Sequence, residues 1–163
     1  MTPLAIDSDD PRAADVYALL ERHLDFCRAT SPPEDVHALD LDGLLDPMVA
    51  FYSVRRDGEL VAIGALKQLD AGHGELKSMH TAAAARGQGA ARALVDHLLG
   101  VARDRGYVRV SLETGSMDAF VPARTLYETA GFTSCGPFGS YSPSPNSTFM
   151  TLTLDGRRDD TPP

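Results

Sequence analysis

The segment with the clearest chemistry spans residues 86–91 and reads RGQGAA. A helix N-terminus carries unpaired backbone N–H groups and a partial positive charge, and both attract an anion. Gly87 and Gly89 lack the Cβ atoms that would keep a diphosphate away from those N–H groups, and Arg86 adds a full positive charge. The segment therefore predicts a diphosphate-binding turn that opens a helix, with a glycine turn that only starts a helix as the alternative.

Two other phosphate-binding loops fit this segment poorly. A Walker loop ends in Gly-Lys-Ser/Thr, which is missing here. A dinucleotide fingerprint needs a third glycine where Arg92 stands, and it comes early in a βαβ series. A third pattern, Arg/Gln-x-x-Gly-x-Gly/Ala, is satisfied by Arg86, Gly89 and Ala91.

The order of predicted elements places this turn between a strand and a long amphipathic helix. We expect strands at residues 4–7, 49–56, 60–69, 75–82, 108–112, 132–135 and 148–154, and helices at 10–28, 36–45, 87–105 and 122–130. Three antiparallel strands are thus followed by an alternation of helices and strands. This order predicts an α+β domain with a mixed sheet, helices on both faces, and one parallel crossover between the strands at 75–82 and 108–112.

Composition narrows the class of protein. The 163 residues are 43% hydrophobic with a net charge of −8, which favours one packed domain over residues 1–155 and a polar tail over 156–163. The acidic balance disfavours nucleic acid and anionic membranes as partners. Cys27 and Cys135 form no CxxC pair, so a zinc site is not expected. Without a signal peptide or a membrane-length apolar run, we expect a cytoplasmic protein.

Residues 123–132, ARTLYETAGF, follow the turn by about 35 residues, and they resemble the second signature of the GNAT acetyltransferases, A-x-x-L-Y-x-x-x-G-F. Segments 36–40, 112–116 and 135–138, together with Tyr141, look like a small bacterial subgroup in which many members have no assigned substrate. The resemblance implies an acyl-CoA-dependent N-acyltransferase. It also implies a GNAT-type sheet of six to seven strands, mostly antiparallel, in which the fourth and fifth strands splay apart to admit the pantetheine arm.

The resemblance also implies how acetyl-CoA is held as a co-substrate. A β-bulge in residues 79–81 would free an N–H group for the thioester carbonyl. Phe120 stands where many members have an asparagine that contacts the pantetheine, so this contact must differ here. The implied cofactor-binding residues are Met79, His80, Thr81, Arg86, Gly87, Gln88, Gly89, Ala90, Ala91, Phe120, Arg124 and Tyr127.

Three residues match positions that can do proton chemistry in the family. Tyr127 matches the frequent general acid that protonates the leaving thiolate, although it could instead only close the helix–sheet junction. Glu75 matches a general base in some members. Lys77 lies two residues further on and should share its face, so a structural ion pair is the competing interpretation. Glu113, at the end of the adjacent strand, is a rival base.

The acceptor pocket should form between the first two helical segments and the loop before the last strand. We expect His37, Asp40 and Tyr141 to contact the acceptor, a small-molecule amine or an amino acid, and no metal to take part. A protein N-acetyltransferase, a non-catalytic acyl-CoA sensor and a partner-binding module are the alternatives. The oligomeric state, a homodimer included, is left open.

Overall fold

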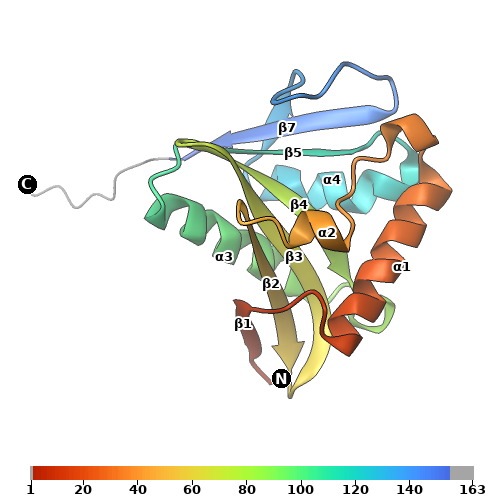
Figure 1. Cartoon of the computed structure of the whole chain (residues 1–163), viewed down its shortest axis with the longest axis vertical. Helices are drawn as coiled ribbons and strands as arrows, with labels where there is room; N and C mark the ends of the chain where they lie inside the picture. The colour runs from red at the N-terminus through yellow and green to blue at the C-terminus, as the bar shows by residue number, and fades with distance from the viewer. Residues whose placement is uncertain (1, 155–163) are drawn as a thin grey trace, which may run out of the picture.

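The computed structural model describes residues 2–154, which build a single seven-stranded sheet flanked by helices (Figure 1). The predicted polar tail, residues 156–163, lies outside the described residues. The strands are β1 (Leu4–Ser8), β2 (Val49–Arg56), β3 (Glu59–Asp70), β4 (His73–Thr81), β5 (Arg109–Gly115), β6 (Thr133–Cys135) and β7 (Ser147–Thr153). The helices are α1 (Ala14–Thr30), α2 (Leu41–Leu44), α3 (Ala90–Asp104) and α4 (Val121–Thr129).

Strands lie in the sheet in the order β1-β2-β3-β4-β5-β7-β6. All neighbours are antiparallel except β4 and β5, which α3 joins by a crossover. The predicted mixed sheet with one parallel crossover is therefore confirmed. Its physical basis is local, because tight turns such as Asp57–Gly58 connect antiparallel strands, whereas parallel strands need a long connection.

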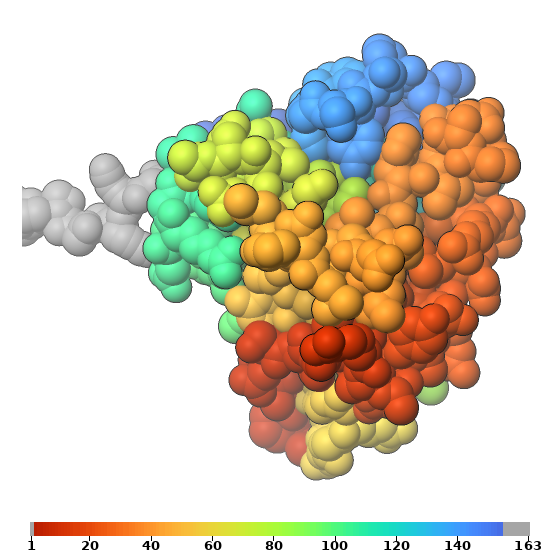
Figure 2. Space-filling view, viewed as in Figure 1, coloured from red at the N-terminus to blue at the C-terminus, as the bar shows by residue number. Residues whose placement is uncertain are grey.

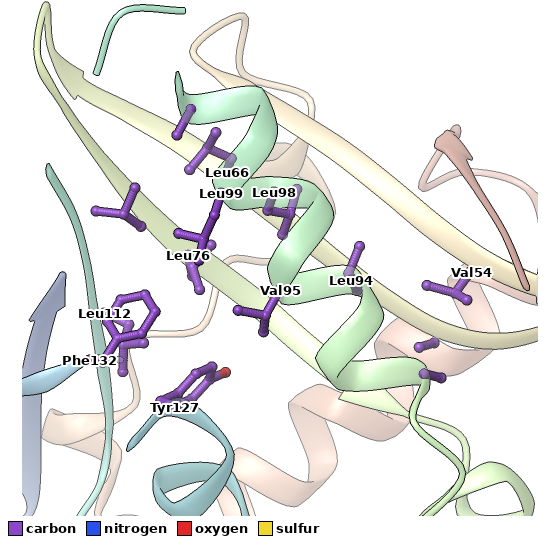
Figure 3. Packing of buried hydrophobic residues seen from close by; sticks show 14 of the residues in the cluster. Val54, Leu66, Leu76, Leu94, Val95, Leu98, Leu99, Leu112, Tyr127 and Phe132 are labelled. Atoms are coloured by element: carbon purple, nitrogen blue, oxygen red, sulfur yellow. The ribbon is translucent and has the colours of Figure 1, made fainter. Parts of the chain in front are cut away.

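Hydrophobic residues form a core on each face of the sheet. The α3 and α4 side packs Leu94, Leu98 and Tyr127 against sheet residues such as Leu76 and Leu112 (Figure 3). The α1 side is a separate cluster whose members come from α1, α2, β2 and β3: Val16, Leu19, Leu20, Leu24, Leu44, Phe51, Ile63 and Ala65. Helices on both faces, as predicted, hold the central strands in place.

The two central strands separate after a short paired stretch. Residues His73–Glu75 of β4 pair with Arg109–Ser111 of β5, and both strands then continue, to Thr81 and Gly115. Tyr127, on α4, packs with its ring centroid 5.8 Å from that of Phe132 (Figure 3). The separation of β4 and β5 is the splay that the resemblance implied.

A β-bulge interrupts β4 just beyond the point of separation. Ile63 of β3 lies opposite His80, whereas Ala65 lies opposite Lys77, so two residues of β4 face Gly64 alone. Ser78, one of those two, has a φ of 59°. A bulge leaves backbone groups outside the ladder, and this bulge, at Ser78 and Met79, overlaps the expected segment 79–81 only at Met79.

Two predicted helices have different bounds in the structure. The first begins at Ala14 and not at Asp10, because the Asp10 carboxylate and carbonyl close a turn on the N–H groups of Arg12 and Ala13. The predicted helix over residues 36–45 was wrong over most of its length. Only α2 is helical within it, because the Asp40 carboxylate accepts from the Gly43 N–H group and starts the helix there.

Candidate functional site

The glycine turn connects β4 to the first turn of α3. Gly87 and Gly89 have φ values of 76° and 90°, which side-chain-bearing residues rarely adopt, and a Cβ at either position would meet nothing within 4 Å. Gly89 is the residue that precedes the helix, and its carbonyl accepts from the Ala93 N–H group. The N–H groups at the start of α3 therefore face an open surface, as anion binding requires.

A cavity of about 470 Å³ runs from this turn along the splayed edge of β4. Ten of the twelve residues expected to bind the cofactor line it: Met79, His80, Thr81, Arg86, Gly87, Gly89, Ala90, Ala91, Phe120 and Tyr127. The Met79 side chain packs onto Gly64, where an added Cβ would lie 2.4 Å from its sulfur, so any contact with the cofactor's polar groups is left to the Met79 backbone.

The other two expected cofactor residues are used differently among the described residues. The Gln88 side chain accepts from Arg56 Nη1 at 2.9 Å and does not line the cavity. Arg124 donates from Nη1 to the carbonyls of Gly115 and Met117, at 2.8 and 3.3 Å, and so fixes the chain that leaves β5. A cofactor-binding role for these two residues stays a prediction.

Phe120 forms part of an aromatic wall where many relatives were expected to carry an amide. Its ring centroid lies 5.2 Å from that of Phe26, and its edge packs so closely on Gly115 that a Cβ there would lie 2.3 Å away. Phe26 also contacts His80, with ring centroids 6.2 Å apart. The Phe120 ring is thus held by aromatic contacts with Phe26 and by Gly115, and a role for it in apolar contact with the pantetheine stays a prediction.

A second cavity, of about 100 Å³, lies on the other side of this wall. Its lining comes from α1, the segment that follows α1, and the splayed parts of β4 and β5, and includes His37, Lys77 and Glu113. Five residues line both cavities: His23, Met79, Phe120, Ala123 and Tyr127. The two cavities therefore meet beside Tyr127, and burial raises the pKa of this phenol, so it stays protonated.

Glu75, Lys77 and Tyr141 form one buried network beside the smaller cavity. Lys77 Nζ lies 3.3 Å from Glu75 Oε2, and Tyr141 donates to the same oxygen at 2.5 Å. Lys77 also donates to the Tyr141 hydroxyl at 2.9 Å and to the His37 carbonyl at 3.1 Å. The predicted ion pair is present, and Glu75 is not among the described residues that line either cavity.

The remaining predicted residues divide between the cavity and the surface. Glu113 lines the smaller cavity, and burial raises the pKa of its carboxyl group. His37 also lines it, with its ring edge-on to Tyr141 at 4.9 Å. Asp40 is exposed, starts α2 through its carboxylate, and is outside the lining formed by the described residues.

Asp35, which lines the smaller cavity, joins two segments that are far apart in sequence. Asp35 Oδ2 accepts from Ser144 Oγ at 3.0 Å and from Asn146 Nδ2 at 3.1 Å. In the space-filling view the segment after α1, in orange, meets the loop before β7, in blue (Figure 2). These contacts hold the Asp35 side chain beside the cavity.

Sequence reasoning missed a histidine pair at the junction of the cavities. His23 Nδ1 lies 3.2 Å from His80 Nδ1, and His23 Nε2 lies 3.8 Å from the Cys27 sulfur. Burial is the largest cause that lowers the pKa of His23 to about 3 and of His80 to about 4. The only signal in the sequence is the four-residue spacing of His23 and Cys27, which places them on one face of α1.

No helix in residues 2–154 is long and apolar enough to cross a membrane. The same residues contain no group of three or more His, Cys, Asp or Glu side chains arranged to hold a metal ion.

Comparisons with known proteins identify the family. The model of the Acetyltransferase (GNAT) family matches residues 14–132. The chain is 47% identical over 149 residues to the uncharacterized N-acetyltransferase YsnE of Bacillus subtilis, covering 91% of this chain and 99% of that one.

Solved structures share the fold. A Klebsiella pneumoniae protein, described provisionally as an acyl-CoA N-acyltransferase, superposes with a TM-score of 0.78 at 31% identity, covering 93% of this chain and 97% of that one. A Bacillus subtilis acetyltransferase in complex with CoA has a TM-score of 0.71 at 16% identity, covering 93% and 99%. With both signatures in place around two adjoining cavities, and with a family match over most of its length, this chain belongs to the Acetyltransferase (GNAT) family.

Proposed function

We propose that this protein transfers an acetyl group from acetyl-CoA to the amine of a small molecule by direct attack. The observation that carries the proposal is the meeting of the two cavities beside Tyr127. One cavity begins at a helix N-terminus suited to a diphosphate, and the other is lined by carboxylate and hydroxyl groups. A thioester reaching along the first would meet an amine in the second.

Cofactor binding rests on the turn before α3. The N–H groups there, with Arg86, would hold the diphosphate of CoA, and the pantetheine would lie between β4 and β5. The bulge at Ser78 supports a backbone donor for the thioester carbonyl, which would stabilise the charge that develops on that oxygen during attack.

Proton transfer rests on two side chains that line the acceptor cavity. Glu113 has a pKa raised by burial, as a base that accepts a proton from an ammonium group requires. Glu75 is already paired with Lys77 and Tyr141. We therefore assign the base to Glu113 and a positioning role to Glu75. Tyr127, at the junction, would give its proton to the CoA thiolate as the sulfur leaves.

Release of free CoA thiol from acetyl-CoA, measured with a panel of small amines, tests the proposal. Tyr127→Phe should lower kcat by about 10²-fold or more while leaving the Kd for acetyl-CoA nearly unchanged. Tyr107→Phe is the matched control, because Tyr107 is also buried but lies outside the described linings of both cavities.

Two outcomes would contradict the assignment. Binding of acetyl-CoA without thiol release on any amine would indicate a sensor and not an enzyme. A Glu75→Gln variant that loses more activity than Glu113→Gln, with both folded, would transfer the role of base back to Glu75.

A further inference from the structure

The charges around the smaller cavity restrict the acceptor. Three groups with ordinarily charged side chains line it: Asp35, Lys77 and Glu113. His23 also lines it, but burial lowers its pKa to about 3 and keeps it neutral. Lys77 is the only lysine or arginine in this lining among residues 2–154. Ion pairing with a carboxylate on the acceptor would therefore fall to Lys77.

Lys77 has no N–H group to spare for such a carboxylate. An ammonium group has three donors, and those of Lys77 point to Glu75 Oε2, the Tyr141 hydroxyl and the His37 carbonyl. The side chain is only 9% exposed, and its charge is balanced by Glu75 at 3.3 Å. An incoming carboxylate would have to break one of these hydrogen bonds inside a buried network.

The two carboxyl groups in the lining lack a comparable cation. Asp35 Oδ2 is held by the Ser144 hydroxyl and the Asn146 amide, which are neutral donors that leave its negative charge in place. Glu113 makes no ion pair within 4.0 Å among the described residues. Once Lys77 and Glu75 balance one another, the excess charge that faces the cavity is negative.

We infer that the acceptor is a small cationic amine without a carboxylate, such as an alkylamine or a diamine, and not a free amino acid; this inference rests on the proposed function. A second ammonium group on the acceptor would meet the negative charges of Asp35 and Glu113, whereas a carboxylate would face these like charges with no free cationic side chain in the described lining. Repulsion between its carboxylate and the carboxylates of Asp35 and Glu113 would strongly disfavour binding of an amino acid.

Three acceptors of equal chain length test the inference: 1-aminobutane, 1,4-diaminobutane and 4-aminobutyrate. Each has a four-carbon chain, and the charged group, where there is one, is at least three methylene groups from the reacting nitrogen, so the basicity of this nitrogen differs little among them. The expected result is a kcat/KM at least tenfold lower for 4-aminobutyrate than for either amine. Equal or better use of 4-aminobutyrate would overturn the inference.

Two variants link the preference to the named groups. Asp35→Asn removes one negative charge, while the asparagine carbonyl can still accept from Ser144 and Asn146. The ratio of kcat/KM for 1,4-diaminobutane to kcat/KM for 4-aminobutyrate should therefore fall by about threefold or more. Tyr141→Phe frees one Lys77 donor and should improve kcat/KM for 4-aminobutyrate by about 3- to 10-fold. Tyr107→Phe, the control, should leave kcat/KM for the amines relative to 4-aminobutyrate unchanged. If this ratio is also unchanged in both Asp35→Asn and Tyr141→Phe, the inference is overturned.

Calorimetry with acetyl-CoA separates this inference from the function on which it rests. A folded protein that binds no acetyl-CoA would refute the proposed function. A protein that binds acetyl-CoA and releases thiol with 4-aminobutyrate alone, or with none of the three acceptors, would refute the inference about the acceptor.

Discussion

The contact between the buried His23 and the half-buried His80 should make the fold sensitive to acid. Replacing His23 with glutamine removes one partner of the pair and keeps a polar side chain of similar reach. In the native protein the pKa of His23 is lowered from 6.5 to about 3, first by burial and then by the nearby charges of His80 and Lys77. In an unfolded chain the imidazole would titrate near its ordinary value.

The sign of the effect follows from where each state binds protons. Below pH 6.5 the unfolded chain takes up a proton on His23 that the folded protein excludes until the pH approaches 3. The folded state therefore has its full stability with respect to His23 above pH 6.5. It loses stability relative to the unfolded chain as the pH falls from 6.5 towards 3. At about 1.4 kcal/mol for each pH unit, the loss between pH 7.5 and 5.0 is about 2 kcal/mol. His80, which is only half-buried, adds a smaller amount in the same direction.

Chemical denaturation of the wild-type protein and of His23→Gln at pH 7.5, 6.5, 5.5 and 5.0 measures the loss of stability that His23 causes. The free energy of unfolding of the wild-type protein, minus that of the variant, should fall by about 2 kcal/mol from pH 7.5 to pH 5.0. The reason is that glutamine, unlike His23, takes up no proton when the chain unfolds. His97→Gln, on α3 with its ring against Tyr52, is the matched control for loss of an imidazole. Parallel loss of stability in the wild-type protein and His23→Gln would refute the reasoning.

Three further predictions concern glycines that the structure uses in different ways. Gly89→Ala, at a φ of 90°, should cost about 1–3 kcal/mol of stability by denaturation and weaken CoA binding about tenfold or more by calorimetry. Gly100→Ala, inside α3 with nothing within 4 Å of an added Cβ, should instead raise stability by up to about 1 kcal/mol with the Kd for CoA unchanged; destabilisation would contradict the open surroundings of Gly100 on α3. Gly115→Ala should displace the Phe120 ring and lower Tm by about 2–10 °C, and an unchanged Tm would show that the aromatic wall is not packed as described.

The sequence by itself determined the order and type of the elements that carry the site. Hydrophobic periodicity and turn residues are local signals, so the strands from 49 to 81 and the long helix after the glycine turn were predicted closely. Gly87 and Gly89 also indicated a backbone with positive φ, because few other residues tolerate this conformation. The two spaced signatures then pointed to the family that the comparisons confirm.

Only the tertiary structure decided which side chains meet in and beside the smaller cavity. Lys77 meets Tyr141 across 64 residues and His23 meets His80 across 57, and no local pattern encodes such distances. The same limit explains why Asp40 and Arg124 were expected in binding roles: their residue types suit ligands equally well, but here they hold the backbone. Residue type and spacing specify local geometry, whereas burial and charge balance depend on packing between distant segments.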